Sequence, residues 1–293
     1  MSASGAAELV LAVLALAATA LALTAVLQVR GTHARVLAIL ILCAVTAVGE
    51  LEALSLVGLL TATALLFGGL IMLIAAAGLW WSYGRPALLE PGRPPLAEVW
   101  RALRSRPALS VLLAVAAGAL SLQAVMAVTV APNEADSLGY HLPRAASWLQ
   151  HRSVLQFQGG QLDDPELAAP PNAEMLLAWT MALTRSDRVT QLVQWWALIS
   201  AALAVFGTAR LIGSRPAESA WAAGLFVLMP EVLLQGATDQ NDSCAHGAAA
   251  RAMHARPTAW EVGTRARTRR DHCEAAAPPV GTSTPSRAPV LLA

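Results

Sequence analysis

The chain has 293 residues, of which 56% are hydrophobic and only 13% charged, with a net charge of +1 and a mean hydropathy of +0.54. Soluble domains carry about 25% charged residues, so this composition excludes an ordinary cytosolic enzyme, a disordered protein and a nucleic-acid binder. Three cysteines in a chain of this length do not make a disulfide framework. The composition is that of a membrane protein.

Apolar segments long enough to cross a bilayer follow one another along the chain. A hydrocarbon core about 30 Å thick requires about 20 apolar residues per helix. We therefore predict an all-α polytopic membrane protein with about six transmembrane helices, over residues 7–29, 36–54, 56–81, 108–131, 189–209 and 219–236. The first segment lacks a basic flank and a small-residue cleavage site, so we interpret it as a retained helix and not as a signal peptide. A further apolar stretch, residues 173–183, is too short to span and predicts an interfacial or re-entrant helix.

The arginine distribution predicts the orientation of these helices. The connection over residues 82–107 is the most basic one, with Arg85, Arg93, Arg101, Arg104 and Arg106. Short basic connections remain in the cytoplasm, so the polar segments 132–171 and 238–242 are both expected on the external face. All 20 basic residues are arginine, which suggests a GC-rich bacterial genome and hence a bacterial plasma membrane.

The long external loop, residues 132–171, holds the candidate site. Glu134 and Asp136 follow a membrane helix, where partial desolvation can adjust the proton affinity of a carboxylate and suit it to general-base catalysis. Tyr140 and His141 come about one helical turn after Asp136. The alternative interpretation is that the acidic residues are solvated loop residues and the aromatic residues are interfacial anchors.

The order of these polar residues resembles a known family. The string Asp136-Ser137-x-x-Tyr140-His141-x-Pro143-Arg144 is followed by Pro170-Pro171-x-Ala173-Glu174, by Gln191-x-Val193-Gln194-Trp195 and by Gln240-Asn241-Asp242. This order resembles the bacterial membrane glycosyltransferases of the GT-C superfamily, in particular the polyprenyl-phosphate-sugar-dependent branch with the protein mannosyltransferases and aminoarabinose transferases. The resemblance covers residues 108–242, and the string from Asp136 to Arg144 is its most specific part.

The resemblance implies a transferase that moves a sugar from a polyprenyl-phosphate carrier to a glycan, lipid or protein acceptor at the external membrane face. It implies that Asp136, accompanied by Glu134, is the catalytic base. The implied substrate-binding residues are Tyr140, His141, Arg144, Arg152, Asp239, Asn241 and Asp242. Among these, Arg144 or Arg152 would stabilise the lipid phosphate. The oxygens of Asp239, Asn241 and Asp242 would hold the acceptor, sugar hydroxyls or a divalent metal ion such as Mg²⁺ or Mn²⁺.

We predict three regions: N-terminal transmembrane helices and a cytoplasmic loop over residues 1–107, the transferase-like region with its catalytic loop over 108–242, and a disordered tail over 243–293. The tail has no Ile, Phe or Tyr but seven of the 20 arginines, a composition typical of disorder. The family pattern implies further helices after residue 242. We therefore expect a frameshift near codon 243, which would make the chain a truncated and inactive fragment. A zinc site at Cys244, His246, His272 and Cys273 is an alternative with suitable residue types but unusual spacing.

Two further interpretations stay open. Glu231 follows Pro230 in the last predicted helix, where it is either a functional group at membrane depth or close enough to the helix end to reach water. The chain as a whole can also be read as a non-enzymatic membrane protein, such as a transporter half or an assembly scaffold. Transporters typically show internal repeats and polar groups at the midplane. Here we find no convincing repeat, and the polar groups gather at one face.

Overall fold

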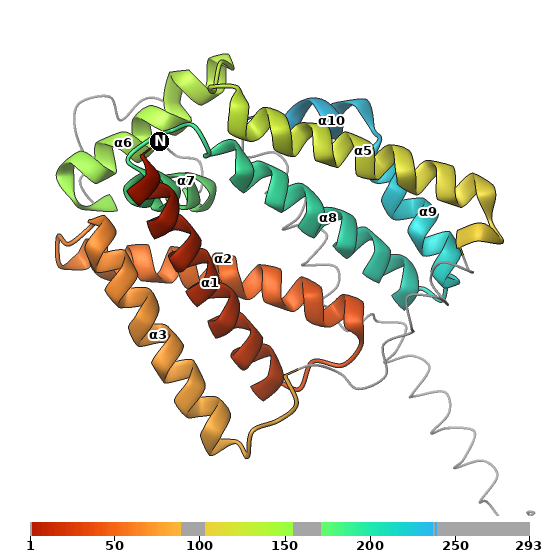
Figure 1. The fold of residues 1–293 in the computed structure, drawn as a ribbon, viewed down its shortest axis with the longest axis horizontal. Helices are drawn as coiled ribbons and strands as arrows, with labels where there is room; N and C mark the ends of the chain where they lie inside the picture. The colour runs from red at the N-terminus through yellow and green to blue at the C-terminus, as the bar shows by residue number, and fades with distance from the viewer. Residues whose placement is uncertain (1, 89–102, 155–170, 237, 239–293) are drawn as a thin grey trace, which may run out of the picture. The chain divides into compact units, whose positions relative to one another are not determined.

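The structure is a computed structural model that describes residues 2–88, 103–154, 171–236 and 238. These residues all belong to the first of two compact units, Met1–His254 and Ala255–Ala293. The regular elements of the described residues are all helical (Figure 1). They are α1 (Ala3–Val26), α2 (Thr32–Leu56), α3 (Ala62–Ser82), α5 (Pro107–Thr129), the π-helix η1 (Ser137–His141), α6 (Leu142–His151), α7 (Asn172–Thr184), α8 (Gln191–Leu211), α9 (Pro216–Val227) and α10 (Pro230–Gln235).

Five helices, α1, α2, α3, α5 and α8, are long and apolar enough to cross a membrane. They contain 21 to 25 residues, which corresponds to about 32–38 Å of helix. Two of these helices start at a residue whose side chain caps the first turn. The Ser2 hydroxyl accepts the Gly5 amide of α1 at 3.1 Å, and the Thr61 hydroxyl accepts the Ala64 amide of α3 at 3.2 Å, as N-caps do. The prediction of an all-helical fold is confirmed for the described residues, and five of the six predicted spans are single helices of this length and apolarity.

The sixth predicted span, residues 219–236, is not a single helix. The chain forms α9, of 12 residues, and then the separate six-residue α10. Pro230 is the cause, because it has no amide to donate and it forces the preceding residue out of the helical conformation. Met229 accordingly has φ −61° and ψ 130°. At about 18 Å, α9 is shorter than the hydrocarbon core, so the prediction of one continuous span was wrong here.

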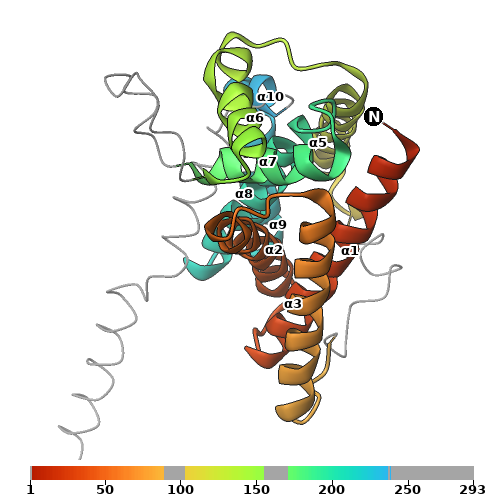
Figure 2. The same cartoon turned by 90° about the vertical axis from the view of Figure 1, so that its left-hand side faces the viewer.

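The short helix predicted over residues 173–183 is α7, which has 13 residues. It contacts α1, α2, α3, α6 and α8, and nine of its residues are buried. Figure 2 shows it between α6 and α2. Its length confirms that it is too short to span. Its burial favours the re-entrant alternative, because a helix lying on the lipid surface keeps one face exposed.

The helix ends gather into two groups. At the loop end, the start of α1 and the end of α2 meet α6 and α7: Arg185 pairs with Glu8 at 3.0 Å, and the Ser55 and Ser153 hydroxyls lie 3.3 Å apart. At the opposite, arginine end, Arg35 donates to the Leu88 carbonyl at 3.4 Å, and the His33 and Phe206 rings are 5.6 Å apart. The arginine distribution predicts this grouping of ends.

Several predictions fall outside the described residues. They concern Asp239, Asn241 and Asp242, the tail over residues 243–293 with its possible zinc ligands, and parts of the two long connections, residues 89–102 and 155–170. These stay predictions.

Candidate functional site

The segment that follows α5 winds into a π-helix before it becomes α6. The Leu142 amide donates to the Ser137 carbonyl, five residues earlier, which is the hydrogen bond that defines a π-helix. Single-turn π-helices are uncommon in proteins as a whole, and those that occur are frequently found at functional sites. The wider turn places Ser137 and His141 inside the protein, at 0% and 2% exposure, while Gly139 between them is exposed.

A buried charged cluster forms where this turn meets the first turn of α7. Glu174 is fully buried, and its Oε1 lies 3.1 Å from Nδ1 of His141 and 3.6 Å from Nη1 of Arg144. Arg144 is 7% exposed. We call His141, Arg144 and Glu174 the Glu174 cluster. The first turn of a helix is also where the helix dipole favours a carboxylate.

Aromatic rings enclose the cluster. The Tyr140 and His141 rings are 3.8 Å apart, with 34° between their planes. The Arg144 guanidinium carbon lies 5.3 Å from the centre of the Trp148 ring, a cation–π arrangement. Trp148 is 2% exposed, so it is a core residue here and not the interfacial anchor that its position near a loop suggests.

The cluster can hold and orient a proton-transfer group. While Glu174 is ionised it can only accept hydrogen bonds, so Nδ1 of His141 carries the shared proton. A neutral His141 then has its lone pair on Nε2, the arrangement by which carboxylates fix histidine tautomers in many sites. The second oxygen of Glu174, Oε2, has no hydrogen-bond partner among the described residues.

The two predicted acids differ from this cluster in their exposure. Asp136 and Glu134 are exposed on the segment between α5 and the π-helix. The Glu134 carbonyl accepts the Leu138 amide at 3.0 Å, which begins the turn, and Asp136 directly precedes it. Their exposure suits contact with a substrate that arrives from water.

The other predicted residues divide between the cluster and the surface. His141 and Arg144 pair with Glu174, and the Tyr140 ring lies against the ring of His141. Arg152 is exposed and ends α6 in the left-handed conformation, with φ 54°. Glu231 is exposed in the first turn of α10 and accepts a hydrogen bond from Gln235 at 2.8 Å, and both of its interpretations stay predictions.

Glu174 is the residue that sequence reasoning missed as a site residue. It closes the piece Pro170-Pro171-x-Ala173-Glu174, and an acid right after a proline pair marks a helix start. That signal locates the residue but gives no partner for it. His141 is 33 positions away, and only the folded chain brings the two side chains together.

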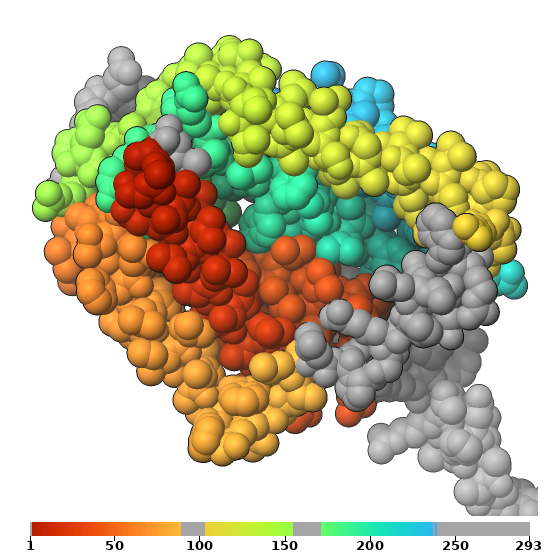
Figure 3. Space-filling view, in the orientation of Figure 1, coloured from red at the N-terminus to blue at the C-terminus, as the bar shows by residue number. Residues whose placement is uncertain are grey.

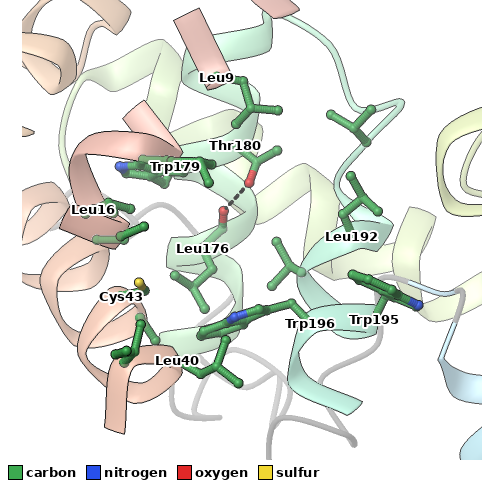
Figure 4. Close-up of a pocket in the computed structure, with 17 residues that line it drawn as sticks. Leu9, Leu16, Leu40, Cys43, Leu176, Trp179, Thr180, Leu192, Trp195 and Trp196 are labelled. Carbon is green, nitrogen blue, oxygen red and sulfur yellow. Dashed lines mark hydrogen bonds between the residues drawn. The ribbon is translucent and has the colours of Figure 1, made fainter. Parts of the chain in front are cut away.

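An apolar cavity of about 410 Å³ lies between α1, α2, α7 and α8. Figure 3 shows the face on which a hollow lies between α1 and α8. In Figure 4 the labelled walls are Leu16 from α1, Cys43 from α2, Trp179 from α7 and Trp196 from α8. The Thr180 hydroxyl donates to the Leu176 carbonyl of its own helix at 2.9 Å, so it offers no free proton to the cavity.

Helix α7 connects the cavity with the Glu174 cluster. Glu174 is in its first turn, and Leu176, Trp179 and Thr180 from its next turns line the cavity. Trp179 comes five residues after Glu174, a rise of about 7.5 Å along the helix. One short helix therefore carries a charged group at its start and an apolar cavity wall further along.

Metal ligands do not gather in the part of the chain that the structure describes: no three His, Cys, Asp or Glu side chains there come together as a metal site. The acids predicted for that role, Asp239 and Asp242, lie beyond it.

Comparison of the chain with known protein families, with curated proteins and with solved structures gives no match.

Proposed function

We propose that the chain is a membrane glycosyltransferase of the GT-C type, or an inactive fragment of one, which uses a sugar donor carried on a polyprenyl phosphate. The observation that carries the proposal is the position of α7, which joins a buried charged cluster to an apolar cavity. A polyprenyl-phosphate sugar has the same two-part character, because its head is charged and its tail is hydrocarbon. The cavity volume, about 410 Å³, is that of a pocket for a drug-sized ligand, so it suits the first units of the tail and not the whole chain.

In this proposal Asp136 is the general base. Its carboxylate takes the proton of the acceptor hydroxyl as the oxygen attacks the anomeric carbon, and the lipid phosphate leaves with the bonding electrons. Glu134 is the accompanying acid. The leaving phosphate needs a cation, and the two candidates differ. Arg152 is exposed, whereas Arg144 is buried against Glu174. The structure therefore favours Arg152 for the phosphate and Arg144 for holding Glu174.

Our proposal locates the reaction at the external face of a bacterial plasma membrane, with a glycan, lipid or protein as the acceptor. Support comes from the loop end, where the segment after α5, α6 and α7 lie together, opposite the end at which Arg35 meets the start of the basic connection. A divalent metal at Asp239, Asn241 and Asp242 stays part of the proposal.

The test uses the full chain in lipid nanodiscs with undecaprenyl-phosphate mannose and undecaprenyl-phosphate aminoarabinose as donors. We expect release or transfer of the sugar, and a loss of about 100-fold or more in turnover for Asp136→Asn, the usual effect of removing a general base. Glu52→Gln is the control, because Glu52 is an exposed acid outside the proposed site, and it should keep the wild-type turnover. A folded wild-type chain that binds donor but never turns it over would contradict enzymatic activity and leave the inactive fragment. A folded chain that binds no donor would overturn both and favour the scaffold alternative.

A further inference from the structure

Helix α2 carries a second buried carboxylate that the proposed reaction does not use. Glu50 is 2% exposed although it lies six residues before the end of α2, about 9 Å inside the helix terminus. An ionisable side chain inside a membrane-spanning segment is costly and is by default a candidate for function. Glu52, two residues on, is exposed.

The carboxyl group of Glu50 is held between α3 and α7. Its Oε2 accepts a hydrogen bond from Nε1 of Trp179 at 3.2 Å. Its Oε1 lies against Gly68 of α3 so closely that a Cβ on this glycine would be 2.5 Å from it. The absent side chain at Gly68 therefore makes the space in which the carboxyl group fits.

The indole that Glu50 holds is a wall of the apolar cavity. Trp179 is 5% exposed and lines the cavity with its ring. In Figure 4 its nitrogen lies at the end of the ring that is remote from Leu192, Trp195 and Trp196. Ala47 and Cys43, one and two turns before Glu50 on α2, also line it. Glu50 thus lies just past the edge of the cavity.

We propose that Glu50 is a positioning residue that, by fixing the ring of Trp179, determines which hydrocarbon chains the cavity accepts. The proposal rests on the polyprenyl-linked donor of the proposed function. A tryptophan ring has two side-chain torsions, and the hydrogen bond to Oε2 selects one orientation. When the bond is lost the ring can turn, the wall loses its fixed shape, and the cavity no longer distinguishes a branched isoprenoid chain from a straight one.

The test measures which hydrocarbon chain the protein prefers to bind, and not the turnover of a donor. The full chain in nanodiscs is titrated with farnesyl phosphate and with dodecyl phosphate, and native mass spectrometry gives both affinities. We expect the wild-type protein to prefer farnesyl phosphate, and Glu50→Leu and Trp179→Phe each to lower that preference by about tenfold, the scale of one lost hydrogen bond. Glu50→Gln keeps an acceptor for the indole and should keep the preference. Glu52→Leu is the matched control on the exposed face.

The outcomes separate the two proposals. If the wild-type chain prefers farnesyl phosphate and the variants behave as expected, but no donor is turned over, the proposed transferase activity fails and the role of Glu50 stands. If donor is turned over while Glu50→Leu and Trp179→Phe keep the wild-type preference at an unchanged melting temperature, the role of Glu50 is wrong. Equal affinities for the two phosphates in the wild-type protein also overturn it. If Glu50→Leu does not fold, the chain preferences of Trp179→Phe and Glu50→Gln still test the role of Glu50.

Discussion

At the scale of single residues, Glu174 is the group on which the site depends most. Its carboxylate pairs with both His141 and Arg144, and none of the three residues is more than 7% exposed. In such a cluster the loss of one member costs more than the pairing energy, because the remaining polar groups stay buried without their partner.

We expect Glu174→Ala to lower the free energy of unfolding by about 3–5 kcal/mol, the range found when one partner of a buried ion pair is removed. Chemical denaturation in detergent micelles, followed by far-UV circular dichroism, measures the change. The exposed acid Glu134, replaced by Ala, serves as the control and should shift stability by less than about 0.5 kcal/mol. Equal, small effects of both substitutions would show that the cluster does not stabilise the loop.

The candidate site could be predicted from the sequence only in part. The string from Asp136 to Arg144 directed attention to His141 and Arg144, and both lie in the buried cluster. Their carboxylate partner comes from α7, and no local pattern records a contact across 33 positions. The same holds for Glu50, whose partner Trp179 is 129 positions away. A hydropathy pattern identifies a helix but not the residues that face each other between helices.

At the scale of elements, the close approach of α3 to α2 depends on a glycine. Two glycines of α3 differ in what a side chain would meet: a Cβ at Gly68 would lie 2.5 Å from Glu50, while nothing is within 4 Å at Gly78. Small residues of this kind allow membrane helices to pack closely.

We expect Gly68→Ala to destabilise the protein by about 1–3 kcal/mol, the cost of forcing extra atoms into a packed interior. Gly78→Ala on the same helix should be neutral or slightly stabilising, because alanine has the higher helix propensity. Thermal unfolding of both variants in the same detergent makes the comparison. A larger loss for Gly78→Ala than for Gly68→Ala would contradict the packing of Glu50 against α3.

The helix boundaries show where the hydropathy pattern predicts the structure and where it does not. Length and apolarity were enough to predict α1, α2, α3, α5 and α8, since a bilayer imposes the same length on every span. The same reasoning passed over Pro230, because the residues on both sides of it are apolar, and it therefore joined α9 and α10 into one span. The backbone of a proline outweighs the hydropathy of its neighbours.

At the scale of the whole described unit, the two groups of helix ends predict an orientation. The arginine end is expected in the cytoplasm and the loop end outside. Leu138 at the loop end is 53% exposed, and Ile212, which follows α8 at the arginine end, is 75% exposed. Both are therefore suitable positions for a labelling experiment.

We expect a membrane-impermeant maleimide to label Leu138→Cys in intact cells and to label Ile212→Cys only after the membrane is permeabilised. The background for both is the chain with Cys43, Cys244 and Cys273 replaced by serine. Labelling of Ile212→Cys in intact cells, with protection of Leu138→Cys, would reverse the orientation and place the Glu174 cluster in the cytoplasm.

The shortness of α7 has a consequence for the order of assembly. Long apolar helices such as α1, α2 and α3 insert into the bilayer one after another as they are synthesised, and they associate afterwards. A helix of 13 residues cannot insert on its own as a span. It can enter only a site that α1, α2, α3 and α8 have already formed, since these are the helices that surround it together with α6. Docking of α7 is therefore a late step of folding, and until it occurs neither Glu50 nor His141 has the partner that α7 brings.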